Sequence, residues 1–102
     1  MPDPELLLLD EPAAGLDLGA REDLVRRLGV IAADPYAPTT VLVTHHVEEI
    51  PLGFTHAMLL RGGGVVASGP IDDVIAAEPL SEAFGLPLRV EHTDGRWFAR
   101  AI

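Results

Sequence analysis

The sequence predicts an α/β fold at the front of the chain and an α+β arrangement of hairpins and short helices behind it. Two short apolar runs, residues 6–9 and residues 40–43, are typical of buried strands. An amphipathic segment that repeats its leucines with a helical period lies between them. Further along the chain, two pairs of strand-like segments each flank a glycine-containing turn.

The first half of the chain is expected to form a βαβ unit. Residues 6–9 are all leucine and end in Asp10-Glu11-Pro12, which is typical of a strand buried on both faces. Asp17 can cap a helix over about residues 18–32. Residues 40–43 form the second buried strand. Two buried strands joined by one helix are expected to be parallel, with a right-handed crossover.

The second half is expected to hold shorter elements. A short helix should follow the second strand around residues 47–50. The remaining expected elements are hairpins over 56–61 with 65–68 and over 88–93 with 96–102, and short helices over 71–77 and 80–84. The three glycines at 62–64 open no helix and are followed by no lysine, so they predict a hairpin turn and not a phosphate-binding loop.

Composition excludes several classes of function. The chain has 102 residues, with 16 acidic and 7 basic side chains and a net charge of −9, which argues against nucleic-acid binding. Lysine and cysteine are both absent, so Schiff-base chemistry, thiolate metal sites and cysteine nucleophiles are excluded. No apolar run approaches the length of a membrane span, and the first residues are acidic where a signal peptide would be positive. We therefore expect a soluble, cytoplasmic chain.

Chemically useful side chains follow both predicted strands. Asp10 and Glu11 come directly after the first strand, and His45 follows the second. The carboxyl ends of parallel strands are where α/β proteins place their sites. An apolar strand that ends in two acids is the pattern of a Walker B motif, in which the first acid holds Mg²⁺ and the second orients and deprotonates a water. The alternative is a strand that simply ends in solvated acids.

Three motifs in order resemble ABC-type ATPases. Residues 6–17, LLLLDEPAAGLD, resemble the Walker B motif and D-loop of that family, and residues 41–49, VLVTHHVEE, resemble its H-loop. Residues 60–70, LRGGGVVASGP, resemble the hairpin that follows the H-loop. The resemblance implies a partial P-loop NTPase core over residues 1–78, with residues 79–102 as a short tail of the same domain. Ala13 departs from the family, which commonly has threonine or serine there.

The resemblance also implies roles for individual residues. Asp10 would organise Mg²⁺ through water, and Glu11 would act as the general base. His45 would contact the γ-phosphate and help to hold the water and Glu11. Asp17 would lie at the contact between two ATPase subunits. His46 is expected to be a bystander, and Glu48 with Glu49 a solvated helix face.

Several parts of such an enzyme have no counterpart here. The Walker A loop, the adenine-stacking aromatic residue, the Q-loop and the signature motif are missing, and the sequence contains neither glutamine nor lysine. Met1 is therefore expected to be an internal position of a longer gene. The complete protein would use ATP and Mg²⁺, pair with a second ATPase subunit and dock onto membrane subunits from the cytoplasm. The isolated chain should neither bind nor hydrolyse ATP.

The resemblance carries one structural expectation and leaves two other functions open. In the family, the Walker A strand lies between the strands that here span 40–43 and 56–60, so we expect either self-association or closure of that gap by the second of them. One alternative function is a non-catalytic interaction module derived from an ABC ATPase. The other is an unrelated magnesium-dependent phosphotransferase that uses Asp10.

Overall fold

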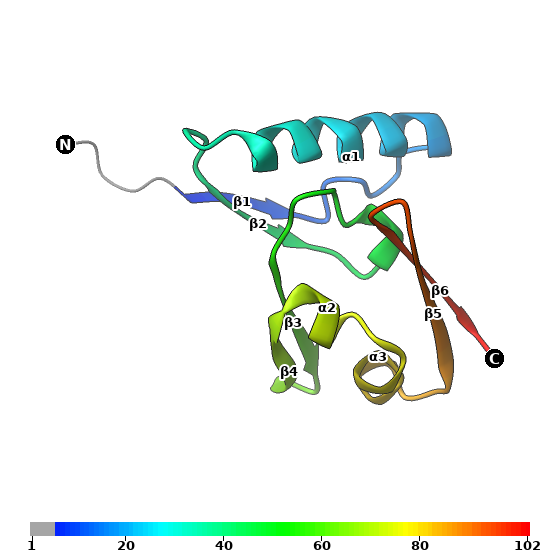
Figure 1. Ribbon diagram of the computed structural model, residues 1–102. Helices are drawn as coiled ribbons and strands as arrows, with labels where there is room; N and C mark the ends of the chain where they lie inside the picture. The colour runs from blue at the N-terminus through cyan, green and yellow to red at the C-terminus, as the bar shows by residue number, and fades with distance from the viewer. Residues whose placement is uncertain (1–5) are drawn as a thin grey trace. The chain divides into compact units, whose positions relative to one another are not determined.

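The computed structural model describes residues 6–102 (Figure 1). The chain divides into two compact units, one that ends at Gly53 and one that spans Phe54–Ile102. The expectation that Met1 is an internal position of a longer gene concerns a residue outside the described range 6–102. None of the helices within residues 6–102 has the length and apolar character needed to cross a membrane.

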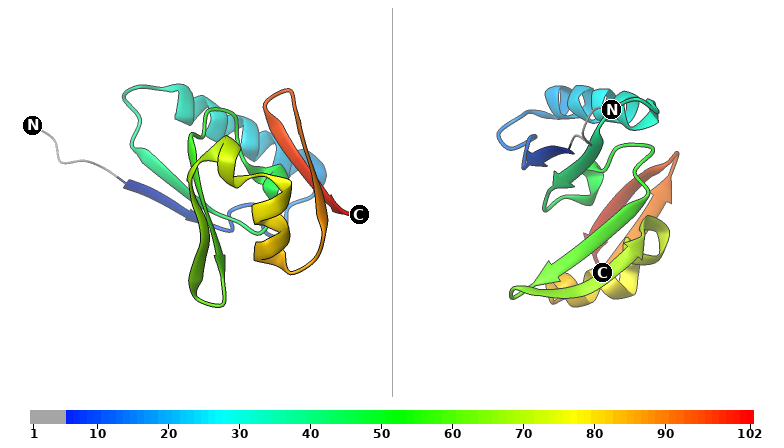
Figure 2. Two further views of the ribbon diagram at one scale, coloured as in Figure 1. Left: turned by 60° about the horizontal axis from the view of Figure 1, so that its bottom comes forward. Right: turned by 90° about the vertical axis from the view of Figure 1, so that its left-hand side faces the viewer.

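The first unit contains the predicted βαβ arrangement. Its elements are β1 (Leu6–Asp10), α1 (Leu18–Ala33), β2 (Thr39–Val43) and the 3₁₀ helix η1 (Val47–Glu49). The two strands are parallel, as predicted, with Leu6 opposite Thr39 and Asp10 opposite Val43. The helix α1 lies along one side of this two-stranded ribbon in each view (Figures 1 and 2).

The capping residue and the apolar stripe of α1 explain where it begins and which side it buries. Asp17 has an extended backbone, and its side chain accepts a hydrogen bond of 2.8 Å from the Ala20 amide. That bond satisfies one of the amides left unpaired at a helix start. Val25 and Leu28 are the buried residues of the helix, so the predicted stripe does face the interior.

The prediction that both strands are buried on both faces is wrong. The side chains of Leu6 and Leu8 on β1 are 64% and 61% exposed, and those of Val41 and Val43 on β2 are 41% and 43% exposed. Side chains alternate across a strand, so these four residues share one face, which we call the outer face. A strand is buried on both faces only when a layer covers each of them, and α1 lies along one side only.

The second unit contains two antiparallel hairpins and two short helices. Its elements are β3 (His56–Arg61), β4 (Gly64–Pro70), α2 (Ile71–Val74), α3 (Ala77–Phe84), β5 (Leu88–Thr93) and β6 (Arg96–Ala101). Both predicted hairpins are confirmed, β3 with β4 and β5 with β6. The helix α3 contacts β3, β4 and β5, and its Leu80 is fully buried.

The described strands pair in twos. Among residues 6–102 there are three two-stranded sheets, β1 with β2, β3 with β4, and β5 with β6. The expectation that residues 56–60 close the gap beside residues 40–43 concerns strands of two different units, so it stays a prediction. One edge of β3 pairs with β4, in a register that runs from His56 opposite Pro70 to Arg61 opposite Gly64.

Candidate functional site

The two acids lie where β1 ends and the chain turns away from the sheet. Asp10 is the last residue of β1 and is exposed. Glu11 follows with a φ of 50°, in the left-handed region, which is uncommon for a residue with a side chain. Its amide still donates a 2.8 Å hydrogen bond to the carbonyl of Val43. This bond extends the β1–β2 ladder by one residue while the Glu11 backbone changes direction.

A compact turn then carries the chain to α1. The Ala14 amide donates to the carbonyl of Glu11 at 3.1 Å, and the Leu16 amide donates to the carbonyl of Ala13 at the same distance. Ala13, the position where threonine or serine is common in the family resembled, is only 6% exposed. The turn ends at Asp17, whose side chain caps the helix.

His45 approaches Glu11 from the end of the neighbouring strand. Its Nε2 lies 3.2 Å from Oε1 of Glu11. That carboxylate oxygen is buried and has no well-aligned hydrogen bond among the described residues, so the contact with His45 is one of proximity. The His45 side chain is 80% exposed, whereas that of Glu11 is 29% exposed. The imidazole therefore has an open side on which a ligand could approach the pair.

The loop that carries His45 is closed by its own hydrogen bonds. The Thr44 hydroxyl donates to Oε1 of Glu49 at 2.6 Å and accepts from the His46 amide at 3.0 Å. The Glu49 amide donates to the carbonyl of His46 at 3.0 Å. Glu49 is only 7% exposed, so its prediction as part of a solvated face is wrong. Sequence reasoning did not single out Thr44.

The donor set suits a weakly held divalent cation better than a closed metal centre. Within residues 6–102, no three histidine or acidic side chains gather closely enough to hold a metal ion. Mg²⁺ is commonly bound through one or two carboxylates, with water and substrate phosphates as its other ligands. The exposed carboxylate of Asp10 beside Glu11 fits that kind of site. A phosphate ligand would have to supply the remaining charged oxygens.

The other histidines that stand on strands have local contacts in the second unit. Nδ1 of His56 lies 2.9 Å from the Thr55 hydroxyl. The ring of His92 stacks on Trp97 across the β5–β6 hairpin, with the ring centroids 4.0 Å apart. Trp97 is 5% exposed and its neighbour Phe98 is 43% exposed, so these two aromatic residues do face opposite sides of β6.

Comparison with known proteins gives consistent relatives. No protein-family model matches the chain. The chain is 43% identical over 98 residues to an ABC transporter ATP-binding protein of Streptococcus mutans, a match that covers 96% of this chain and 38% of the relative. It is 45% identical over 98 residues to the ABC transporter ATP-binding protein YlmA of Bacillus subtilis, with 96% and 37% covered. The chain thus spans less than two fifths of these curated relatives.

A solved structure has a similar fold. It is a metal-chelate type ABC transporter in an inward-facing conformation, and the match has a TM-score of 0.70 at 24% identity. The match covers 95% of this chain and 39% of that chain.

Proposed function

Because the chain belongs to the family of ABC transporter ATP-binding proteins, we propose that it is the hydrolytic part of an ATP-binding subunit that drives transport. The observation that carries this proposal is the contact between Glu11 and His45, at 3.2 Å, from the ends of two parallel strands. Phosphoryl transfer depends mainly on positioning and on charge stabilisation around the γ-phosphate. A carboxylate and an imidazole held together at a strand edge supply two of the groups required.

Each residue of the site has a proposed role. Glu11 accepts the proton of the attacking water, because its buried Oε1 has no well-aligned hydrogen bond within the described residues. His45 orients Glu11 and contacts the γ-phosphate through its exposed side. Asp10 holds Mg²⁺ through water, and the metal would stabilise charge on the phosphate oxygens. ATP and Mg²⁺ are thus the cofactors of the complete protein.

The complete protein would work as an assembly. We infer that Asp17, at the start of α1, lies at the contact with a second ATPase subunit. Membrane subunits would hold this pair at the cytoplasmic face of a membrane, peripheral to it. Residues 1–78 would form the end of the ATPase core and residues 79–102 a tail of the same domain. The transported substrate would be selected by the membrane subunits.

The isolated chain should be inactive, since it contains no Walker A sequence to cradle the phosphates. The test is to mix it with a separately produced segment of a relative that contains Walker A and the signature motif, and to measure phosphate release. Activity that depends on both parts, is lost in Glu11→Gln and is kept in Glu91→Gln supports the proposal. Glu91 is an exposed carboxylate of β5 and serves as the matched control.

The mixing experiment also tests the alternative function. Stable binding of the two parts without phosphate release would favour a non-catalytic interaction module derived from an ABC ATPase. Phosphate release by the 102-residue chain alone would contradict the proposal that Walker A must come from elsewhere. If the two parts neither bind nor release phosphate, the hydrolytic proposal is contradicted.

We also propose that the isolated chain self-associates through the outer face, because four apolar side chains of paired strands are exposed there. Leu8 and Val41 are direct cross-strand partners on it. Replacing both with threonine should lower the weight-average mass measured by light scattering. The matched control replaces Leu60 and Val65, a cross-strand pair on β3 and β4 that is at least as exposed, and should leave the mass unchanged. A monomer at all concentrations would contradict the proposal.

A further inference from the structure

We propose that Thr44 and Glu49 position His45 against Glu11, an inference that rests on the proposed hydrolytic function. The reason to look beyond the four residues already assigned is the burial of Glu49. A carboxylate that is 7% exposed has given up most of its hydration. Such a group is retained only where it is well hydrogen-bonded, and the partner that the structure gives Glu49 is the residue directly before His45.

The Thr44 hydroxyl makes two hydrogen bonds, one as donor and one as acceptor. It donates to Oε1 of Glu49 at 2.6 Å and accepts from the amide of His46 at 3.0 Å. The residues on either side of His45 are therefore joined to each other, because the His46 amide donates to the Thr44 hydroxyl oxygen. A short hydrogen bond to a carboxylate is also among the stronger kinds in proteins. The pair fixes the backbone on both sides of His45.

The main chain of Glu49 adds a second restraint to the same loop. Its amide donates to the carbonyl of His46 at 3.0 Å, and the next amide, that of Ile50, donates to the carbonyl of Val47 at 3.1 Å. These bonds form η1, a single short turn that would be weak without further support. Glu49 thus holds the loop through both its side chain and its backbone, and His45 is the residue that this loop presents to Glu11.

The reason for such a device is the exposure of His45. An imidazole that is 80% exposed has little packing to fix its position. Its distance of 3.2 Å from Glu11 must therefore come from the backbone that carries it. Hydrolysis would be sensitive to this distance, because misplacing a catalytic group by about 1 Å can cost two orders of magnitude in rate. Thr44 and Glu49 act through His45 and are positioning residues.

The first test uses the isolated chain and needs no ATP hydrolysis. Amide hydrogen exchange at His46 should become at least about tenfold faster in Thr44→Val, which removes the hydroxyl but keeps the shape. The conservative Thr44→Ser should restore protection. Thr39→Val, which replaces an exposed threonine at the start of β2, is the matched control and should change nothing. Protected amides in α1 will show that each variant remains folded.

The second test asks whether the loop determines the position of His45. In the unaltered chain, Glu11→Gln should shift the NMR resonances of the His45 ring, because the two side chains are in contact. In a Thr44→Val background, the same substitution should shift them much less. Equal shifts in both backgrounds, or unchanged exchange at His46 in Thr44→Val, would overturn the inference whatever the ATPase measurements show.

The third test addresses catalysis in the mixed system. Thr44→Val and Glu49→Ala should lower kcat for ATP with KM little changed, and Thr44→Ser should recover kcat. A rise in KM with kcat unchanged would show that the pair supports nucleotide binding instead and would overturn the positioning role. If the mixed system has no activity at all, the proposed function fails, while the exchange and resonance measurements still decide the role of Thr44.

Discussion

Oε1 of Glu11 and Nε2 of His45 lie 3.2 Å apart although they follow different strands. The strand register explains why they meet. Asp10 is opposite Val43, and the Glu11 amide donates to the Val43 carbonyl, so the chain beyond β1 remains beside the chain beyond β2. Glu11 then turns with a positive φ, and His45 lies two residues beyond the end of β2. A parallel register and one unusual backbone angle thus bring the two residues to the same edge of the sheet.

The backbone of Glu11 should cost stability. A left-handed conformation is unfavourable by about 1–2 kcal/mol for a residue with a Cβ, whereas glycine adopts it freely. We expect Glu11→Gly to be more stable than Glu11→Ala by about 1 kcal/mol in urea unfolding. The comparison of two truncations cancels the loss of the carboxylate itself.

The same pair of substitutions at Asp10 is the matched control. Asp10 ends a strand, where glycine is less stable than alanine by roughly 0.5–1 kcal/mol. The order of the two variants should therefore reverse between neighbouring positions. Alanine more stable than glycine at both positions would contradict strain at Glu11. Strain at a residue that would serve as the general base is expected where function, and not stability, selects the conformation.

The order and pairing of the elements could be predicted from sequence because they depend on local signals. The leucine run, the Asp17 cap and the turn at Asp94-Gly95 each act over a few residues. The proximity of Glu11 and His45 could also be predicted from the sequence, since the ends of neighbouring parallel strands share an edge. These local signals specify the order of the helices and strands along the chain. They therefore also place the residues that directly follow each strand.

Two features could not be predicted, for different physical reasons. The outer face is apolar in sequence, and composition does not tell whether a covering layer belongs to the same 102 residues. Glu49 follows another acid, so its pattern is that of a solvated helix. Its burial arises from the hydrogen bond to Thr44 across a 3₁₀ turn, and helical periodicity does not describe such a turn.

Leucines of the first unit should differ sharply in their contribution to stability. Leu28 on α1 is 5% exposed and Leu8 on β1 is 61% exposed. We expect Leu28→Ala to cost about 2–5 kcal/mol, because it leaves a cavity. Leu8→Ala should cost less than about 0.5 kcal/mol in the monomer, as exposed substitutions usually do. Urea unfolding at low protein concentration measures both. A large cost at Leu8 in the monomer would mean that the outer face is covered.

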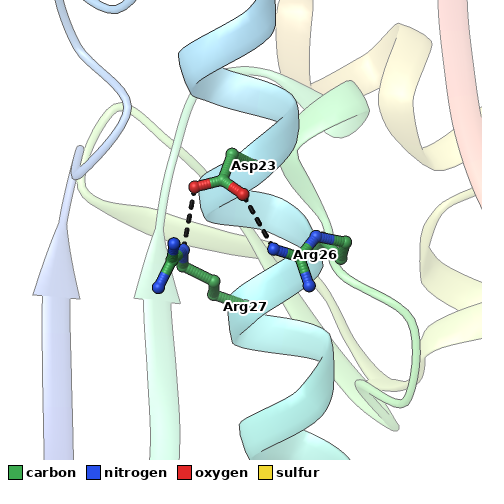
Figure 3. A network of polar contacts seen from close by, with 3 residues as sticks. All are labelled: Asp23, Arg26 and Arg27. Carbon is green, nitrogen blue, oxygen red and sulfur yellow. Dashed lines mark hydrogen bonds and ion pairs between the residues drawn. The ribbon is translucent and has the colours of Figure 1, made fainter.

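Asp23 should give the stability a weak dependence on acid. The hydrogen bond from Arg27, followed by that from Arg26, lowers the pKa of Asp23 from its usual 3.8 (Figure 3). Because the folded pKa is the lower one, the ionised carboxylate stabilises the folded state above pH 3.8, and this contribution is lost as the pH falls through the folded pKa. The unfolding free energy of Asp23→Asn should therefore be below that of the unaltered chain at neutral pH and equal to it in strong acid.

Salt distinguishes this effect from a change of packing. All three side chains are between 49% and 68% exposed, so the difference should be small and should shrink as ionic strength rises. Glu91→Gln, which removes an exposed carboxylate from β5, is the control for charge alone. A difference between Asp23→Asn and the unaltered chain that persists in strong acid and high salt would show that the ion pairs are not its cause.

Asp17 combines a local structural role with a proposed role between subunits, and substitutions can separate them. Its side chain accepts a hydrogen bond of 2.8 Å from the Ala20 amide. Loss of such a cap costs about 1 kcal/mol, whereas asparagine and serine cap equally well. We expect Asp17→Ala to lower the free energy of unfolding by that amount, and Asp17→Asn and Asp17→Ser to leave it nearly unchanged. If the acidic group itself is needed at the subunit contact, all three variants should weaken ATP hydrolysis in the mixed system. Full activity in Asp17→Asn, together with reduced stability in Asp17→Ala, would limit Asp17 to the cap of α1.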